Sequence, residues 1–185
     1  MTAPTHKVLQ ERMARARTNM PRFFDPKGFA TLQAVCGRLF PPQADVVQID
    51  IAGQIDSALA QSEGDGWRYD AMPPDSDAHR LGLEGIEQTA NALFNKSFVQ
   101  LSGSQQNTVL SVVQQGTALG TQWLTVPSTI FFEELLALAT GFFYAHPLVQ
   151  ESIGYAGMAD APGWHLIGLN QLEAREPGLL PDQND

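Results

Sequence analysis

The chain has 185 residues, a formal net charge of −9 and a single cysteine. This length fits one domain that buries about 70% of its unfolded surface, so the fold needs neither a disulfide nor a structural metal. The negative charge excludes nucleic-acid binding by bulk electrostatics. Cys36 lies within an apolar helical pattern and is expected to be an inert core residue.

Residues 1–22 hold the one basic cluster, from Lys7 to Arg22. Because this segment has little apolar content, we expect an N-terminal basic helix or flexible arm, with a docking arm for an acidic partner as the alternative. It contains no apolar run of signal-peptide length and no adjacent pair of arginines. The chain as written is therefore expected to be cytoplasmic. The alternative is a periplasmic protein, exported with a partner or after loss of a signal.

The first helix of the main domain is predicted to begin at Asp25-Pro26, where an N-cap residue precedes a proline at N1. Its apolar positions follow a spacing of three and four residues up to Leu39. The helix is expected to end there because Pro41-Pro42 cannot continue it.

A second helix is expected to be capped by Asp45 and to end before Gly64. Its apolar residues recur every fourth position, and its two acidic residues fall largely away from that stripe. The stripe consists of Ile51, Ile55 and Leu59, and the acidic residues are Asp50 and Asp56.

Residues 63–79 are rich in Gly, Pro and Asp and predict a loop, which Trp67 and Tyr69 are expected to pin to the domain. Apolar spacing then predicts a helix over about 80–94. Ser102 and Gln105 form a capping-box pattern that predicts the start of the next helix, and Gly116 is a natural residue to follow its end.

The segment from Ile130 to Tyr144 predicts a helix that is apolar over well over half of its circumference. Such a helix must be buried on several sides, either in a helical core or against another protein. Gly141 inside it should cost about 1 kcal/mol relative to Ala, a loss that is recovered if the missing side chain lets another helix approach closely. His146 is expected to complement the dipole at the end of this helix.

Together these elements predict an all-α protein, with a single domain over residues 23–174. The domain is expected to be an irregular bundle of about five to six helices with long loops. From Ile153 the chain is expected to form an extended C-terminal wrap, and residues 175–185 a disordered tail.

No catalytic, cofactor-binding or metal-binding motif occurs in the sequence, so we expect no catalytic residue and no cofactor in this chain. The four histidines are scattered, and none is spaced as a pair of metal ligands. The remaining candidates are residues for contact with another protein: Phe131, Phe132, Glu134, Phe142, Tyr144, Tyr155 and Trp164. No segment is long and apolar enough to span a membrane.

The order of several motifs resembles the gluconate 2-dehydrogenase subunit 3 family over roughly residues 23–170. The similar segments are FFDPKGFATLQAVCGRLFPP, VVQIDIAGQIDSAL, LGLEGIEQTANALFNKSFVQLSGSQQNTVL, FFEELLALATGFFYAHPLV and IGYAG. Members of this family often begin with a twin-arginine export signal; no such arginine pair occurs in the sequence as written, so periplasmic residence is not the first expectation.

The resemblance implies a non-catalytic small subunit of a bacterial flavin dehydrogenase that acts on sugars or sugar acids. The larger partner subunit would bind FAD and oxidise the substrate, and a cytochrome subunit is a possible further partner. The small subunit would be a chaperone-like structural partner that the larger one needs to mature.

Two other functions stay open from the residues alone. The first is a stand-alone enzyme or small-molecule binder with a pocket near Trp67, Tyr69, Tyr155, Trp164 and His165. The second is a self-associating helical protein, whose apolar surface is covered by a second copy of the chain.

Overall fold

The computed structural model describes residues 3–14, 18, 20–41, 49–61, 69–155 and 171. Within these residues the protein consists of helices and contains no strand, which confirms the all-α class. The elements are α1 (Ala3–Met13), α2 (Pro26–Leu39), α3 (Ile51–Ala60), α4 (Asp75–Phe94), η1 (Phe98–Gln100), α5 (Gly103–Gln114), η2 (Thr121–Leu124), α6 (Ser128–Tyr144) and α7 (Pro147–Ser152), where η denotes a short 3₁₀ helix. Trp67, Asp45 and most of the expected C-terminal wrap lie outside the described residues.

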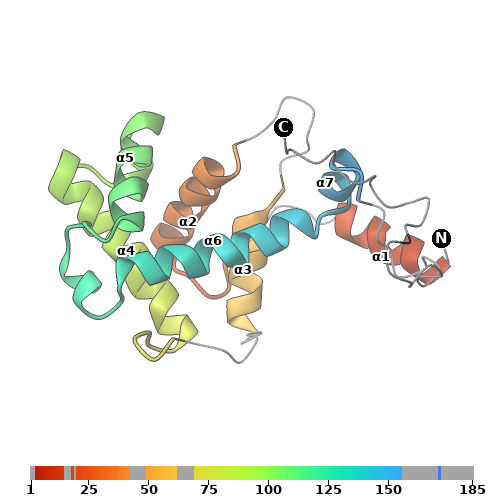
Figure 1. Ribbon diagram of the computed structural model, residues 1–185, viewed down its shortest axis with the longest axis horizontal. Coiled ribbons are helices and arrows are strands. Elements are labelled where there is room, and N and C mark those ends of the chain that lie inside the picture. Colours follow the sequence, from red (N-terminus) through yellow and green to blue (C-terminus); the bar gives the residue numbers. More distant parts are fainter. Residues whose placement is uncertain are drawn as a thin grey trace.

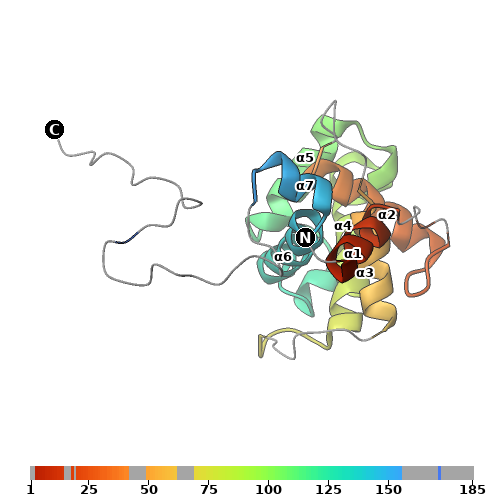
Figure 2. The ribbon, with the colours of Figure 1, turned by 90° about the vertical axis from the view of Figure 1, so that its right-hand side faces the viewer.

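The helices pack around α6, which crosses the body of the molecule and contacts α3, α4 and α5 (Figure 1). Helix α2 packs between α3, α4 and α5. The core between these helices is apolar, and its largest fully buried side chains include Phe98, Phe131, Leu32, Ile55 and Ile86. Helices α1 and α7 lie together beyond one end of α6, with α1 toward the reader in Figure 2.

Three local signals in the sequence are confirmed at the helix ends. The side chain of Asp25 accepts a hydrogen bond from the backbone N–H of Gly28 and caps α2, as the Asp-Pro pair predicts. Ser102 and Gln105 form the predicted reciprocal capping box of α5. Gly116 follows the end of α5 with φ +74°, a left-handed conformation that glycine adopts without strain.

Two predicted helix starts are wrong. Helix α3 begins at Ile51 and is capped by Asp50, whose side chain accepts from Gly53 N–H, so Asp45 is not its cap. Helix α4 begins at Asp75, inside the segment expected to be a loop. Two acidic residues in its first turn, Asp75 and Asp77, favour this earlier start because they complement the positive end of the helix dipole.

Asp56 is buried in the structure, although its position off the apolar stripe of α3 does not predict burial. Its side chain is 1% exposed and accepts hydrogen bonds from the backbone N–H groups of Arg22 (2.6 Å), Phe23 (3.1 Å) and Phe24 (3.0 Å). A buried carboxylate is stable only when its oxygens are hydrogen-bonded, and these three donors supply those bonds. We call this arrangement the Asp56 clasp.

Two glycines of α4 receive aromatic rings from later parts of the chain. A Cβ atom on Gly82 would overlap the ring of Phe131, and a Cβ atom on Gly85 would lie 2.6 Å from the ring of Trp123. The two rings also contact each other, with centroids 5.8 Å apart. Trp123 is fixed further because its Nε1–H donates to Thr89 Oγ1 at 3.0 Å. The close approach of α4 to α6 and η2 therefore depends on these missing side chains.

Candidate functional site

The surroundings of α6 change from buried to exposed along its length. Its buried residues are Ser128, Phe131, Phe132, Leu135 and Ala139, and none of its residues beyond Ala139 is buried. In the same direction the helix leaves the body of the molecule, so its last turn lies near α7 rather than within the bundle (Figure 1). One apolar helix thus serves both as core and as surface.

The predicted contact residues divide between these two environments. Phe131 and Phe132 are 1% and 8% exposed, so both belong to the hydrophobic core and the surface of the folded chain does not present them. Burial therefore corrects their assignment: they are packing residues. Glu134 is half-buried on the same helix. Trp164 lies outside the described residues.

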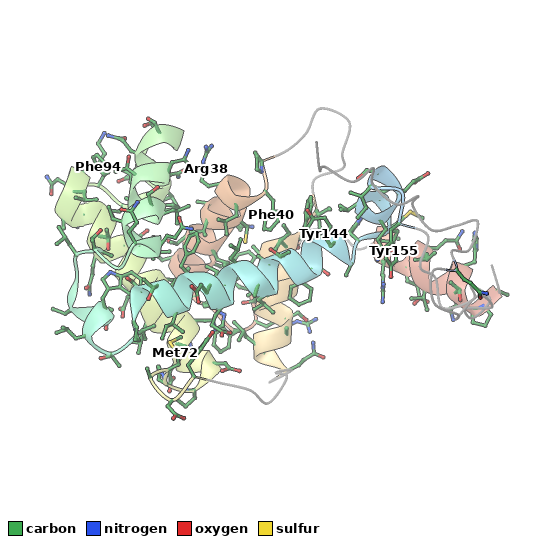
Figure 3. The ribbon with its side chains drawn as sticks, viewed as in Figure 1. Arg38, Phe40, Met72, Phe94, Tyr144 and Tyr155 are labelled. Atoms are coloured by element: carbon green, nitrogen blue, oxygen red, sulfur yellow. The ribbon has the colours of Figure 1, made fainter. Side chains whose placement is uncertain are left out.

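Tyr144 and Tyr155 lie at the surface, at the outer end of α6 (Figure 3), and are 47% and 53% exposed. Ile153 beside them in the sequence is 56% exposed, and Phe142 is half-buried. Large apolar side chains exposed on neighbouring elements are typical of protein-contact surfaces. We call the surface formed by these four residues the α6–α7 end.

Ring contacts join the last turn of α6 to the end of α2. Phe143 stacks on Phe40 with ring centroids 4.7 Å apart, and Tyr144 meets Phe143 edge to face at 5.2 Å. His146 does not complement the end of α6 as expected. Instead it caps the start of α7, where its Nδ1 accepts from Leu148 N–H at 3.3 Å.

Gly141 lies on the last turn of α6, beside Tyr144, and is exposed. No helix among the described residues makes such a close approach, because a Cβ atom added at Gly141 would have none of their atoms within 4 Å. Helix α1 covers one side of this region by contacting α7, yet α1 has no buried residue.

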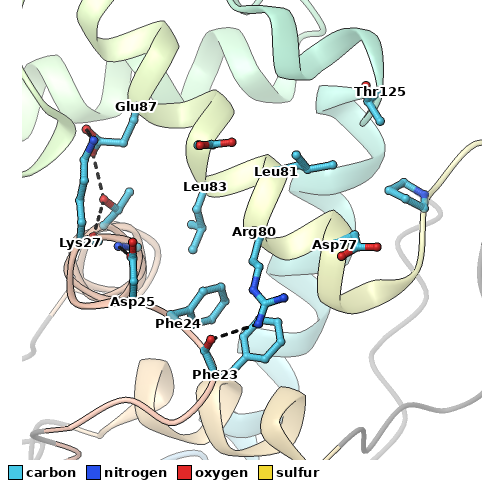
Figure 4. Close-up of a pocket in the computed structure, with 14 residues that line it drawn as sticks. Phe23, Phe24, Asp25, Lys27, Asp77, Arg80, Leu81, Leu83, Glu87 and Thr125 are labelled. Carbon is cyan, nitrogen blue, oxygen red and sulfur yellow. Dashed lines mark hydrogen bonds and ion pairs between the residues drawn. The ribbon is translucent and has the colours of Figure 1, made fainter.

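A groove of about 830 Å³ lies on a different side of the molecule, between the start of α2 and the outer face of α4 (Figure 4). Its lining includes Phe23, Phe24 and Leu83, together with the charged side chains of Lys27 and Arg80. The sequence does not indicate this groove, since its two walls are about 50 residues apart in the chain. Its volume is within the range of about 300–1,000 Å³ that is usual for small-molecule pockets.

Two buried groups with unusual acidity do not form a reactive pair. Burial raises the pKa of the Cys36 thiol to about 12, so the thiol stays protonated, in agreement with its expected role as a core residue. Burial also lowers the pKa of His79. Its Nδ1 lies 2.8 Å from the carbonyl oxygen of Asp75, which can only accept, so Nδ1 carries the proton. Its Nε2 has no hydrogen-bond partner among the described residues.

The described residues contain no group of three or more His, Cys, Asp or Glu side chains that could hold a metal ion. None of their helices combines the length and apolar character needed to cross a membrane. The features that stand out are therefore two surfaces, one apolar and one grooved and charged.

The family model for gluconate 2-dehydrogenase subunit 3 matches residues 26–163. The chain belongs to this family. Neither the curated proteins nor the solved structures that were searched gave a match. The matched residues begin with the first residue of α2 and include every described helix of the subunit-3 chain except α1. Both the groove and the α6–α7 end lie largely within the part that defines the family.

Proposed function

We propose that this subunit-3 protein is a non-catalytic small subunit that binds and stabilises a larger FAD-dependent dehydrogenase and helps it to mature. The family is named for a subunit of a dehydrogenase, which supports membership in such a complex. FAD and the oxidation of a sugar or sugar acid belong to the larger subunit in this proposal. A cytochrome subunit is a further expected partner.

The observation that carries the proposal is the exposed α6–α7 end on a domain that already has its own core. Phe131 and the residues packed around it fill the interior, so the tyrosines at the other end of the same helix are not needed to complete it. Tyrosine is enriched at protein interfaces because it combines a large apolar ring with a polar group. The first contact that we expect with the larger subunit is therefore made by Tyr144, Ile153 and Tyr155.

The test is recovery of the partner from the native host with a tagged chain, measured by mass spectrometry and by flavin absorbance. We expect the chain to recover a larger flavoprotein in a stoichiometric amount. The double variant Tyr144→Asp/Tyr155→Asp should recover about tenfold less or lower still, because it places charges in an apolar contact.

Val99→Asp is the matched control, since Val99 is an apolar residue of η1 with a similar exposure of 46%. This variant should recover the flavoprotein as the wild type does. Recovery of the unmodified chain alone, without flavin, would contradict the proposed function. A homodimer in light scattering would then favour self-association.

A further inference from the structure

The groove beside α2 and α4 has rigid walls. On one side, the Asp56 clasp holds the backbone of Phe23 and Phe24, whose rings meet edge to face at 4.7 Å. On the other, Glu87 of α4 accepts from Thr31 Oγ1 at 3.0 Å and lies 3.8 Å from Lys27 Nζ. Glu87 therefore ties α2 to α4 directly (Figure 4). A site whose walls are already fixed loses little entropy on binding.

The floor of the groove is apolar. Phe24 and Leu83 are 6% and 3% exposed and form part of the core beneath it, while Phe23 is half-buried and presents its ring. Figure 4 shows these three side chains facing the space between the two helices. An apolar side chain of a partner would find contact area there that no described residue of this chain occupies.

The charges around the groove are unbalanced. Its lining carries four carboxylates and two cations: Asp25, Asp77, Glu84 and Glu87 against Lys27 and Arg80. Lys27 is paired with Glu87. Arg80 is therefore the one lining cation left to neutralise the other carboxylates. It lies on α4 between Asp77 and Glu84, at the spacings where helical ion pairs form.

Arg80 pairs with neither of these neighbours. Its guanidinium lies 4.1 Å from the ring centroid of Phe23, and its Nη2 donates to the carbonyl oxygen of Phe23 at 3.3 Å. Among the described residues Asp77 has no ion pair, and the one recorded partner of Glu84 is the neutral side-chain amide of Gln122, at 2.7 Å. Asp77 and Glu84 are thus left without a cation, as is Asp25, whose side chain caps α2 instead.

We propose that this groove binds a basic segment of the larger subunit, with an apolar side chain over Phe23 and Leu83 and cations paired with Asp77 and Glu84. That the segment comes from the larger subunit rests on the proposed function. That the groove binds a basic and apolar segment does not depend on it. Asp77 and Glu84 are two helical turns apart, about 10 Å along α4. Two lysines four residues apart in an extended peptide are separated by about 13 Å and share one face with the residue midway between them.

The first experiment titrates the isolated full-length chain with the peptide acetyl-Lys-Ala-Leu-Ala-Lys-amide at low salt, followed by amide NMR. We expect shifts confined to residues 23–31 and 77–87. The variant Asp77→Asn/Glu84→Gln should weaken binding about 2- to 30-fold, as expected for two exposed ion pairs. The control Asp70→Asn/Glu133→Gln removes two exposed carboxylates outside both the groove and the α6–α7 end and should leave binding unchanged.

Arg80→Gln separates a cation site from an anion site. If the groove binds cations, this variant binds the lysine peptide as tightly as the wild type or more tightly, because a repelling charge is removed. Tighter binding of acetyl-Glu-Ala-Leu-Ala-Glu-amide, or loss of lysine-peptide binding in Arg80→Gln, would overturn the proposal. So would shifts outside the groove, or no shifts at all.

The second experiment tests the source of the segment in the complex from the native host. Asp77→Asn/Glu84→Gln should recover less of the larger subunit than the Asp70→Asn/Glu133→Gln control, with a smaller dependence on salt. Equal recovery would exclude the larger subunit as the source. Failure of the wild-type chain to recover any larger subunit would count against the proposed function, while the peptide titration would still decide the chemistry of the groove.

Discussion

The two ends of α6 have similar sequences and opposite environments. Phe131 near its start is 1% exposed and fits against Gly82 of α4, whereas Tyr144 at its end is 47% exposed and meets the ring of Phe143 edge to face. Aromatic content alone therefore does not distinguish core from surface. What distinguishes them is whether other helices reach that part of α6: α3, α4 and α5 contact it within the body, and α7 lies at its outer end (Figure 1).

The largest expected effect comes from truncating one ring at each end. Phe131→Ala should lower the free energy of unfolding by about 3–5 kcal/mol, because it leaves a cavity between α4 and α6. Tyr144→Ala should lower it by about 1 kcal/mol or less, since its ring is half in solvent already. Urea unfolding of both variants measures the difference. Equal losses would show that the two ends are not energetically distinct.

The next effect concerns the fit between α4 and the buried end. Gly82→Ala should lower the free energy of unfolding by about 1–3 kcal/mol, because the new methyl group overlaps the ring of Phe131. That ring has little room to move, since it is also in contact with Trp123 and His79. Urea unfolding is again the measurement. A neutral or stabilising result would mean that the helices can separate without cost.

A smaller effect should appear in the pH dependence of the free energy of unfolding, through a histidine packed against the buried end of α6. Burial lowers the pKa of His79 in the folded protein, so below about 6.5 the unfolded chain binds more protons than the folded one. The free energy of unfolding should therefore fall as the pH is lowered from about 6.5 toward the folded-state pKa. His79→Gln should flatten this part of the profile, measured by urea unfolding at a series of pH values.

His146 is the control for this measurement, because burial lowers its pKa as well but it lies at the outer end of α6. His146→Gln should remove less of the pH dependence than His79→Gln, since His146 is the more exposed of the two. An unchanged slope in His79→Gln would contradict the assignment of the effect to His79.

The smallest effect is the same glycine substitution made at the exposed end. Gly141→Ala should raise the free energy of unfolding by up to about 1 kcal/mol, because alanine favours the helix and the methyl group meets no neighbour among the described residues. Thermal unfolding of Gly141→Ala and Gly82→Ala should therefore show changes in stability of opposite sign for the same substitution. A loss of stability in Gly141→Ala would show that this turn is covered by part of the chain.

The features that the sequence predicts correctly depend on neighbouring residues. The cap at Asp25 and the capping box of Ser102 and Gln105 involve atoms three positions apart, so the local pattern contains the whole interaction. The apolar spacing of α2 and α5 is local in the same way. These patterns, taken in order, also carry the resemblance to the subunit-3 family.

The features that the sequence does not predict depend on distant residues. The donors to Asp56 lie 32 to 34 positions before it in the chain, so nothing near Asp56 indicates that it is buried. The contact of Phe131 with Gly82 and the preference of Arg80 for Phe23 are long-range in the same sense. The sequence therefore indicates which kinds of residue form the candidate surfaces, but not which of those residues lie together in the fold.

The Asp56 clasp also determines how the chain would carry mechanical load. A pull on the segment before α2 would be resisted at residues 22–24, whose backbone N–H groups are bonded to Asp56 of α3 and not to the α2 that follows them in the sequence. Part of the load would therefore pass to α3, and through the bond from Arg80 to the Phe23 carbonyl to α4, before it reached α2. A tag, a surface linker or a fused protein placed ahead of residue 18 would be attached to a point that is already anchored.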